Sequence, residues 1–153
     1  MRDERTLRDL LLVGLEALDA AQGSVLLADE RHEFLTFAVT ASRGALARHE
    51  QEFAPLTGRK IAWGEGVTGR AALTARTQKS DGGHETGRMR IVGDGAPSAV
   101  LAVPMLDVRG EVLGVVTAVS FDRIREFAPE ACRLYERVAA IAAALVGQEG
   151  ALT

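Results

Sequence analysis

The segment from Trp63 to Ala72 has the sequence WGEGVTGRAA and contains three glycines. Gly64, Gly66 and Gly69 have the G-x-G-x-x-G spacing that places backbone amides around the pyrophosphate of a dinucleotide. That chemistry requires a buried strand before the motif and alternating strands and helices after it. Here a short strand with a polar start precedes the motif, and a glycine-rich loop and a hairpin follow. The glycines therefore predict a sharp strand-to-helix turn, with positive φ at Gly64 and Gly66 and close helix packing at Gly69.

Other reactive side chains are few. Cys132 is the single cysteine, so no intrachain disulfide is possible. A buried apolar role is favoured for it over a redox role, although the start of a helix would lower the pKa of its thiol. His32, His49 and His84 are far apart in sequence. We expect no metal site and no bound cofactor, with a transition metal beside His84 as the remaining alternative.

Catalytic motifs are missing from the chain. It contains no G-x-S-x-G nucleophile elbow, no H-E-x-x-H pair and no Walker loop. The carboxylates are numerous but scattered, and spacing alone places no pair on one wall. The sequence therefore predicts a protein that is not an enzyme.

Composition is that of one soluble domain. The chain has 153 residues, 47% of them hydrophobic and 25% charged. Its 18 basic residues are dispersed among 21 acidic ones, giving a net charge of -3. This dispersal argues against nucleic acid or an anionic membrane as the main partner. No apolar run is long enough to span a bilayer, and one cysteine fits a reducing compartment, so we expect a cytoplasmic protein.

Periodicity predicts helices at both ends of the chain with strands between them. A first helix is expected over residues 3–21, strands over 24–29, 34–42 and 59–63, and a short helix or loop over 43–57. A short helix follows over 67–76, then a brief strand over 77–80 and a long glycine-rich loop over 81–96. Strands at 98–106 and 111–120 form a hairpin, both central in the sheet, and a last helix runs from about 128 to 146. This order indicates an α+β fold.

A set of collinear segments resembles the GAF domains of signalling proteins. In order they are LLVGLEALDAAQGSVLLAD, GEGVTGRAALTAR, SAVLAVPML, GEVLGVVTAVS and FAPEACRLYERVAAIAAALV. The resemblance implies a single domain over residues 1–153, with a core over about 7–146. It implies a twisted antiparallel sheet with the N- and C-terminal helices on one face. The short helix and the long loop would close a pocket on the other face.

The resemblance does not identify a ligand. Bilin-binding GAF domains attach the pigment through a cysteine near the sheet, whereas Cys132 lies in the final helix. The free methionine sulfoxide reductases use cysteines for redox turnover, and one cysteine cannot supply both an attacking and a resolving thiol. The signature of the cyclic-nucleotide members has no counterpart here.

Strand alternation assigns faces to the two strongest strands. Val100, Ala102 and Pro104 share one face, and the odd-numbered residues from Val115 to Val119 share one face of the next strand. Pigment-binding GAF domains imply that these sets face the pocket and that Trp63 and the long loop form its rim. Thr36 and Thr40 alternate on the second strand, without an assigned face. The predicted ligand-binding residues are Thr36, Trp63, Gly66, His84, Arg88, Met89, Ala102, Thr117 and Val119.

The terminal helices predict a homodimer through residues Leu7 to Leu18 and Leu134 to Val146. The last helix has one stripe at Leu134, Val138, Ile141, Ala142 and Leu145, and a second at Ala139, Ala143 and Val146. A helix that is apolar nearly all round is buried nearly all round, which favours a four-helix bundle between two subunits. An additional element that covers the helix within one subunit is the alternative.

Two functions remain open, and a third is remote. The chain is a small-molecule sensor, or it is a ligand-free dimerisation and relay module with a filled pocket. An enzyme of the free methionine sulfoxide reductase type is the third. In the first two readings, output comes from a partner or from an effector domain outside this sequence.

Overall fold

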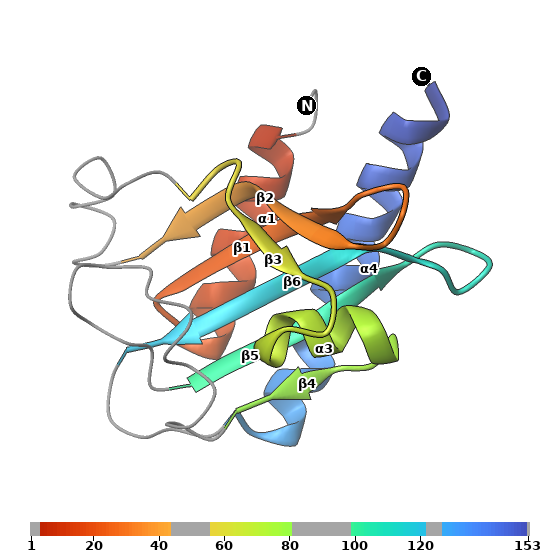
Figure 1. The fold of residues 1–153 in the computed structure, drawn as a ribbon. Coiled ribbons are helices and arrows are strands. Elements are labelled where there is room, and N and C mark those ends of the chain that lie inside the picture. The colour runs from red at the N-terminus through yellow and green to blue at the C-terminus, as the bar shows by residue number, and fades with distance from the viewer. Residues whose placement is uncertain (1–3, 44–55, 81–98, 122–126, 153) are drawn as a thin grey trace.

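An antiparallel sheet of six strands in the order β3-β2-β1-β6-β5-β4 forms the centre of the molecule (Figure 1). The computed structural model describes residues 4–43, 56–80, 99–121 and 127–152. Within these ranges the elements, in chain order, are α1 (Glu4–Leu18), β1 (Gln22–Ala28), β2 (Phe34–Ser42), β3 (Lys60–Ala62), α3 (Gly66–Thr74), β4 (Gln78–Lys79), β5 (Ala99–Leu106), β6 (Val112–Ser120) and α4 (Pro129–Leu152).

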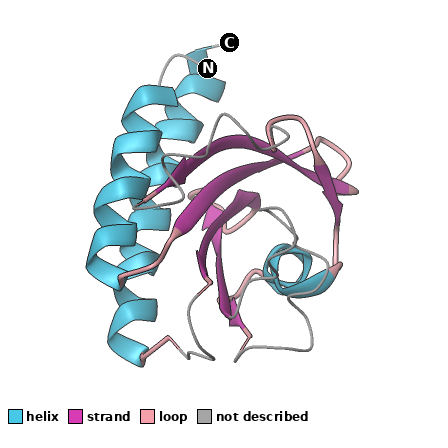
Figure 2. Ribbon diagram, turned by 90° about the vertical axis from the view of Figure 1, so that its left-hand side faces the viewer, coloured by secondary structure: helices cyan, strands magenta, loops and turns pink. Residues whose placement is uncertain are grey.

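The helices cover the two faces of the sheet unequally. The terminal helices α1 and α4 lie side by side on one face, and α3 lies within the curl of the sheet on the other (Figure 2). The α+β fold expected from the sequence is confirmed, including the placement of both terminal helices on one face. Among the described helices, none has the length and apolar character needed to cross a membrane.

The helix-covered face is packed with apolar side chains. α1 buries Leu7, Leu11, Leu15 and Leu18, a 3- and 4-residue spacing that gives one apolar stripe. α4 buries Tyr135 together with valine and alanine residues of the same stripe. Sheet residues on this side include Val25, Val39, Ala41, Leu101, Val103, Val116 and Ala118.

The two terminal helices approach closely at Gly14. A β-carbon at this position would lie 3.0 Å from Cε1 of Tyr135 and 3.1 Å from Cγ2 of Val138. A side chain at this position would require Tyr135 or Val138 to move by a few tenths of an ångström, so glycine is the residue that fits without a shift.

The glycine turn before α3 has the predicted backbone. Gly64 and Gly66 have φ angles of +85° and +63°, which L side chains rarely adopt. A β-carbon on Gly69 would lie 2.6 Å from the carbonyl oxygen of Ala62, at the end of β3. The turn therefore holds the first turn of α3 directly against the sheet edge.

Pro104 fits its strand because β4 is so short. β4 pairs only with Leu101 and Ala102 of β5, so the edge of β5 is open beyond that point. The amide and carbonyl of Val100 bond to Ser80 on the β4 side, and alternation points the nitrogen of Pro104 the same way. The proline therefore removes no bond to β6. β6 is central as expected, whereas β5 is central only over its first half.

Element ends differ from the prediction in small ways. α1 ends at Leu18 rather than near residue 21, because Asp19 adopts a left-handed φ of +54°. β1 begins at Gln22, two residues earlier than expected, and α4 continues to Leu152. Most of the segments predicted over 43–57 and 81–96 lie outside the described residues.

Candidate functional site

The face of the sheet that α3 covers has an apolar half and a polar half. In the apolar half, Val67, Ala71 and Ala72 of α3 pack on the sheet. The strand residues beneath them include Leu26, Leu35, Phe37, Val100, Ala102, Val115 and Val119. Side chains fill this half, as expected for a core with close-packed interior atoms.

The polar half lies toward the first residues of β1 and the last residues of β2 and β6. Strand pairing sets Ser24 between Thr40 and Thr117, and sets Gln22 between Ser42 and Val119. These side chains alternate with residues of the helix-side core, so they point to the α3 side. We call the following residues the polar cluster: Gln22, Ser24, Thr40, Ser42 and Thr117.

Hydrogen bonds join the polar cluster across the strands. The hydroxyls of Ser24 and Thr40 lie 2.9 Å apart, and Nε2 of Gln22 donates to Oγ of Ser42 at 2.9 Å. All members except Thr40 are buried. Each is uncharged, so this part of the face offers hydrogen bonds without a net charge.

Three of the predicted ligand-binding residues lie on this face. Thr117 belongs to the polar cluster, Val119 lies next to Gln22, and Ala102 pairs with Thr117. The face assigned to β5 and β6 from alternation is therefore confirmed as the α3 side. Whether these residues contact a ligand stays a prediction.

Thr36 points to the other side, so it does not share a face with Thr40. Leu26 pairs with Phe37 and Val25 pairs with Val39, which leaves Ala38 as an extra residue in β2. Such a bulge reverses the alternation of the strand. Thr36 pairs with Leu27, which packs against the helix-side core.

Trp63 and Gly66 lie at the turn before α3 rather than at the polar cluster. Trp63 packs against the apolar half, and the His32 ring stacks on it with centroids 4.6 Å apart and an interplanar angle of 8°. His84, Arg88 and Met89, like the neighbouring Arg90, lie outside the described residues.

The predicted ligand-binding residues include only Thr117 of the polar cluster; Thr40 was named without an assigned face, and the other three members were missed. Ser24 was available from alternation, because it precedes Val25 in a predicted strand. Gln22 and Ser42 were not, since Gln22 lies before the expected start of that strand and Ser42 at the end of the next. A pairing register is needed to bring these residues together.

Each terminal helix is hydrogen-bonded to a strand that carries the polar cluster. The Tyr135 hydroxyl of α4 donates to the backbone carbonyl of Thr117 at 2.6 Å. Burial raises the pKa of this tyrosine, so the hydroxyl stays protonated and acts as a donor. Arg43, directly after β2, donates from Nη1 to the carbonyls of Leu15 and Ala20 at 3.1 and 2.9 Å. It thereby caps the C-terminal end of α1.

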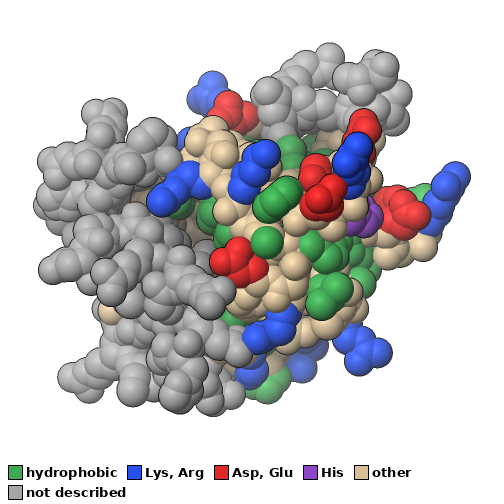
Figure 3. All heavy atoms as spheres, in the orientation of Figure 1, with side chains coloured by type: hydrophobic (Ala, Val, Ile, Leu, Met, Phe, Trp, Pro, Cys, Tyr) green, Lys and Arg blue, Asp and Glu red, His purple; other side chains and the backbone are tan. Residues whose placement is uncertain are grey.

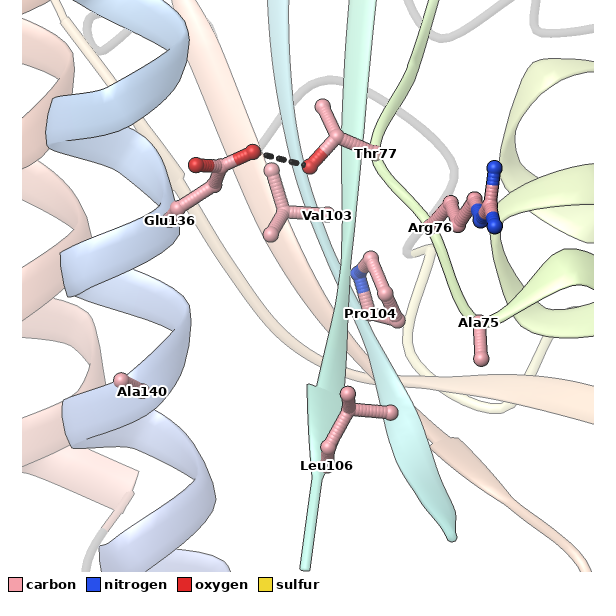
Figure 4. A pocket seen from close by; sticks show the side chains of 8 residues that line it. All are labelled: Ala75, Arg76, Thr77, Val103, Pro104, Leu106, Glu136 and Ala140. Carbon is pink, nitrogen blue, oxygen red and sulfur yellow. Dashed lines mark hydrogen bonds between the residues drawn. The ribbon is translucent and has the colours of Figure 1, made fainter. Parts of the chain in front are cut away.

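A separate depression of about 440 Å³ lies beside the open edge of β5. Thr77 and Glu136 point toward each other across it and share a hydrogen bond of 2.6 Å, while Arg76 turns toward α3 (Figure 4). None of the predicted ligand-binding residues is among those that line it: Ala75, Arg76, Thr77, Val103, Pro104, Leu106, Glu136 and Ala140. The polar cluster contains Thr117 of the predicted set, so it is the candidate site that agrees with the sequence.

The outer surface in the view of Figure 3 mixes both signs of charge with single apolar side chains. Phe34 and Leu73 are 40% and 62% exposed. In the part of the chain that the structure describes, no three metal-ligating side chains gather in one place.

Cys132 has a less reactive environment than its position at a helix start suggests. Burial raises the pKa of the thiol, and this outweighs the nearby positive charge of Lys79. The lowered pKa expected from the sequence is therefore wrong, because burial disfavours the thiolate more than the positive charges of Lys79 and Arg133 favour it.

Comparison with known proteins agrees with this architecture. The family description that matches the chain is that of the GAF domain, over residues 2–146. The chain belongs to the GAF domain family. No curated protein matches it.

Solved structures resemble this GAF domain over nearly its whole length. The GAF domain of an Acinetobacter phosphoenolpyruvate-protein phosphotransferase is 16% identical with a TM-score of 0.76, covering 98% of this chain and 85% of that one. The second GAF domain of DevS from Mycobacterium smegmatis is 20% identical with a TM-score of 0.70, covering 98% and 97%. A free methionine-R-sulfoxide reductase from Neisseria meningitidis is 20% identical with a TM-score of 0.68, covering 95% and 80%. At these identities the likeness shows a shared fold.

Proposed function

We propose that this GAF domain is a non-catalytic sensory or regulatory module of the cytoplasm. It binds a small molecule against the polar cluster and signals through its terminal helices. The observation that carries the proposal is the buried row of neutral hydrogen-bonding side chains on the α3 side of the sheet. A core needs no such groups for stability, and buried polar groups that converge on one face are typical of ligand sites.

The signalling route follows the two hydrogen-bonded links. A ligand that displaces Thr117 acts on the carbonyl that receives the Tyr135 hydroxyl, and so on α4. A ligand that displaces Ser42 acts through the adjacent Arg43 on the end of α1. The terminal helices would then have two arrangements that differ in how α1 and α4 cross. A ligand shifts the balance between them only to the extent that it binds one with higher affinity than the other.

A homodimer through α1 and α4 gives these helices an output. Three large apolar side chains on the terminal helices are not covered by the rest of the chain. Val13 is 67% exposed, Ile141 53% and Leu134 38%. Ala17 of α1 and Leu134 of α4 line one depression, so the exposed apolar side chains of the two helices adjoin there. A second copy of the chain would cover these side chains in an isologous four-helix bundle. The signal then passes to a partner or to an effector domain outside this sequence.

Light scattering at micromolar concentration tests the dimer. We expect the unchanged protein to form a dimer and Ile141→Glu to form a monomer, because the charge would be buried without a partner. Leu73→Glu is the matched control, since Leu73 is also more than half exposed but lies on α3, on the opposite side of the sheet. A wild-type protein that stays monomeric removes the interface and the relay.

Thermal-shift screening of nucleotides, amino acids and tetrapyrroles tests the ligand site. A compound that binds the polar cluster should raise the melting temperature of the wild type and lose affinity for Thr117→Val, which keeps the side-chain shape. Equal affinity for both proteins would place the ligand elsewhere.

The second candidate is a ligand-free dimerisation and relay module. The filled apolar half of the α3 side supports it, because no ligand is needed to complete that packing. Under this alternative the dimer forms as above, and no compound in the screen discriminates Thr117→Val from the wild type.

Catalysis of the free methionine sulfoxide reductase type has little support in this chain. The single thiol, Cys132, has a raised pKa and thus little thiolate at neutral pH. We expect no reductase activity and slow alkylation of Cys132 by iodoacetamide in the folded protein. Turnover that disappears in Cys132→Ser would establish the enzyme instead.

A further inference from the structure

Gln22 has an unusual position in the polar cluster. It is the first residue of β1, is only 3% exposed, and points to the α3 side between Ser42 and Val119. Glutamine is seldom buried so deeply unless its amide is fully hydrogen-bonded.

The amide of Gln22 is satisfied on one side only. Nε2 donates to Oγ of Ser42, but Oε1 has no hydrogen-bond partner in the described part of the chain. Among the buried side-chain nitrogen and oxygen atoms of the described residues, Oε1 of Gln22 is the only one without a hydrogen-bond partner. A buried acceptor without a donor lowers the stability of the fold, so a structural role does not explain it.

Within the described ranges, the polar cluster to which Gln22 belongs carries no charged side chain. The other cluster members are hydroxyl side chains, and the nearest basic residue along the strand, Arg43, is bound to carbonyls at the end of α1. An anionic ligand group placed here would be desolvated without a counter-charge from the cluster, which is unfavourable. A neutral N–H or O–H group would complete the hydrogen bonding without that cost.

We propose that Gln22 is the specificity-determining residue of the site, and that the ligand presents an uncharged N–H or O–H donor to its Oε1. Primary amides, hydroxyls and ring N–H groups of heterocycles belong to this class, and carboxylates do not. This inference rests on the proposed function, because it names the chemistry of the ligand that the polar cluster binds.

Matched pairs of probes test the class directly. Benzamide and benzoate, and nicotinamide and nicotinate, differ only in the amide or carboxylate group. NMR titration at millimolar concentration is read at the side-chain amide of Gln22. We expect the amides to shift this signal and the carboxylates to leave it unchanged. A carboxylate that binds there as well as its amide overturns the inference, and so does a signal that no probe moves.

A double variant separates specificity from structure. Gln22→Met with Ser42→Ala removes the unpaired Oε1, the Nε2 donor and the hydroxyl that accepts from Nε2 together, so we expect the free protein to melt at or above the wild-type temperature. The same variant should bind the amide probes about tenfold more weakly, the loss of one buried hydrogen bond. Gln78→Met is the matched control, a glutamine on β4 at the far edge of the sheet, and should retain full affinity. A double variant that melts well below the wild type shows that Gln22 is a structural residue and overturns the inference.

The two proposals fail in distinguishable ways. Binding that Thr117→Val weakens, but that the Gln22 double variant leaves intact, keeps the site and removes the specificity role. Binding that neither variant changes removes both. Binding that both variants weaken is the expected result.

Discussion

On the face that α1 and α4 cover, the sheet presents mainly valine, leucine and alanine side chains. On the α3 face, half of the surface is equally apolar, but the other half is made of the hydroxyl and amide groups of the polar cluster. Both faces are buried, so hydration does not explain the difference. A fold that needed only stability would fill both faces with apolar side chains, because buried polar groups contribute little net free energy.

The contrast separates two tasks within one sheet. The helix-covered face is tightly fitted: Gly14 and Gly23 both leave room for Tyr135, whose hydroxyl reaches the backbone of β6. Tight fits transmit displacement, since packed interiors deform little. The polar half of the other face is suited to recognition, because its hydrogen-bonding groups distinguish one ligand from another. The following predictions test this division, from the largest expected effect to the smallest.

Substitution of Gly23 by alanine should cost the most. The new β-carbon would lie 2.7 Å from the carbonyl oxygen of Thr117, 2.9 Å from the Tyr135 hydroxyl and 3.0 Å from Cδ2 of Leu15. The strand must shift and the hydroxyl must leave its acceptor, so we expect the free energy of unfolding to fall by about 3 kcal/mol. Chemical denaturation measures it.

Gly147→Ala is the control for that substitution. Nothing lies within 4 Å of a β-carbon built at Gly147, in α4. Alanine there should stabilise the protein by up to about 1 kcal/mol through helix propensity. If Gly23→Ala is as mild as this control, the helix-covered face is loosely packed and the relay through Tyr135 loses its basis.

Substitution of Gly66 by valine tests the α3 side and should cost about 2 kcal/mol. Here no atom lies within 4 Å of an added β-carbon, so the expected loss comes from the φ of +63° alone. Gly66→Asn should cost less than Gly66→Val, because asparagine tolerates left-handed backbone. Thermal unfolding of the two variants compares them, and equal melting temperatures would mean that the turn relaxes around either residue.

The sequence predicted the helices and strands better than it predicted which face of the sheet each strand residue points to. β5 and β6 were assigned the right faces because their pairing is regular from Ala99 to Met105 on β5 and from Gly114 to Ser120 on β6. The bulge in β2 reversed the direction of Thr36, and nothing in the string FLTFAVTAS marks Ala38 as an extra residue. Alternation predicts a face only until the first bulge.

The polar cluster was harder to predict than the fold for a related reason. Its members come from β1, β2 and β6, and their proximity depends on strand register, which single-strand patterns do not contain. Gln22 also gave no signal of its own, because glutamine after a helix reads as an exposed residue. Thr117 was found because it interrupts an apolar run.

Tyr135→Phe should have a moderate effect on stability and a larger one on coupling. The substitution keeps the buried ring but removes the donor to the Thr117 carbonyl, for which we expect a loss of about 1 kcal/mol. Ligand affinity should persist while any ligand-dependent change in dimerisation disappears, because only the link to α4 is cut. Scattering with and without ligand measures the coupling. A variant whose dimer still responds to ligand as the wild type does would show that the hydroxyl is not part of the route.

The smallest expected change comes from replacing Ser24 and Thr40 together. Ser24→Ala alone removes one partner of the 2.9 Å hydroxyl pair and should cost about 1 kcal/mol, since the other hydroxyl is left half-buried and unpaired. With Thr40→Val added, both groups are apolar and of similar shape, so stability should return to within about 0.5 kcal/mol of the wild type. Urea unfolding of the four proteins completes a double-mutant cycle.

The near-neutral double variant should nevertheless lose ligand binding, because the cluster has lost two of its hydroxyls. A double variant as unstable as the sum of its parts would mean that the hydroxyls stabilise the sheet, and the contrast between the two faces would no longer separate stability from recognition.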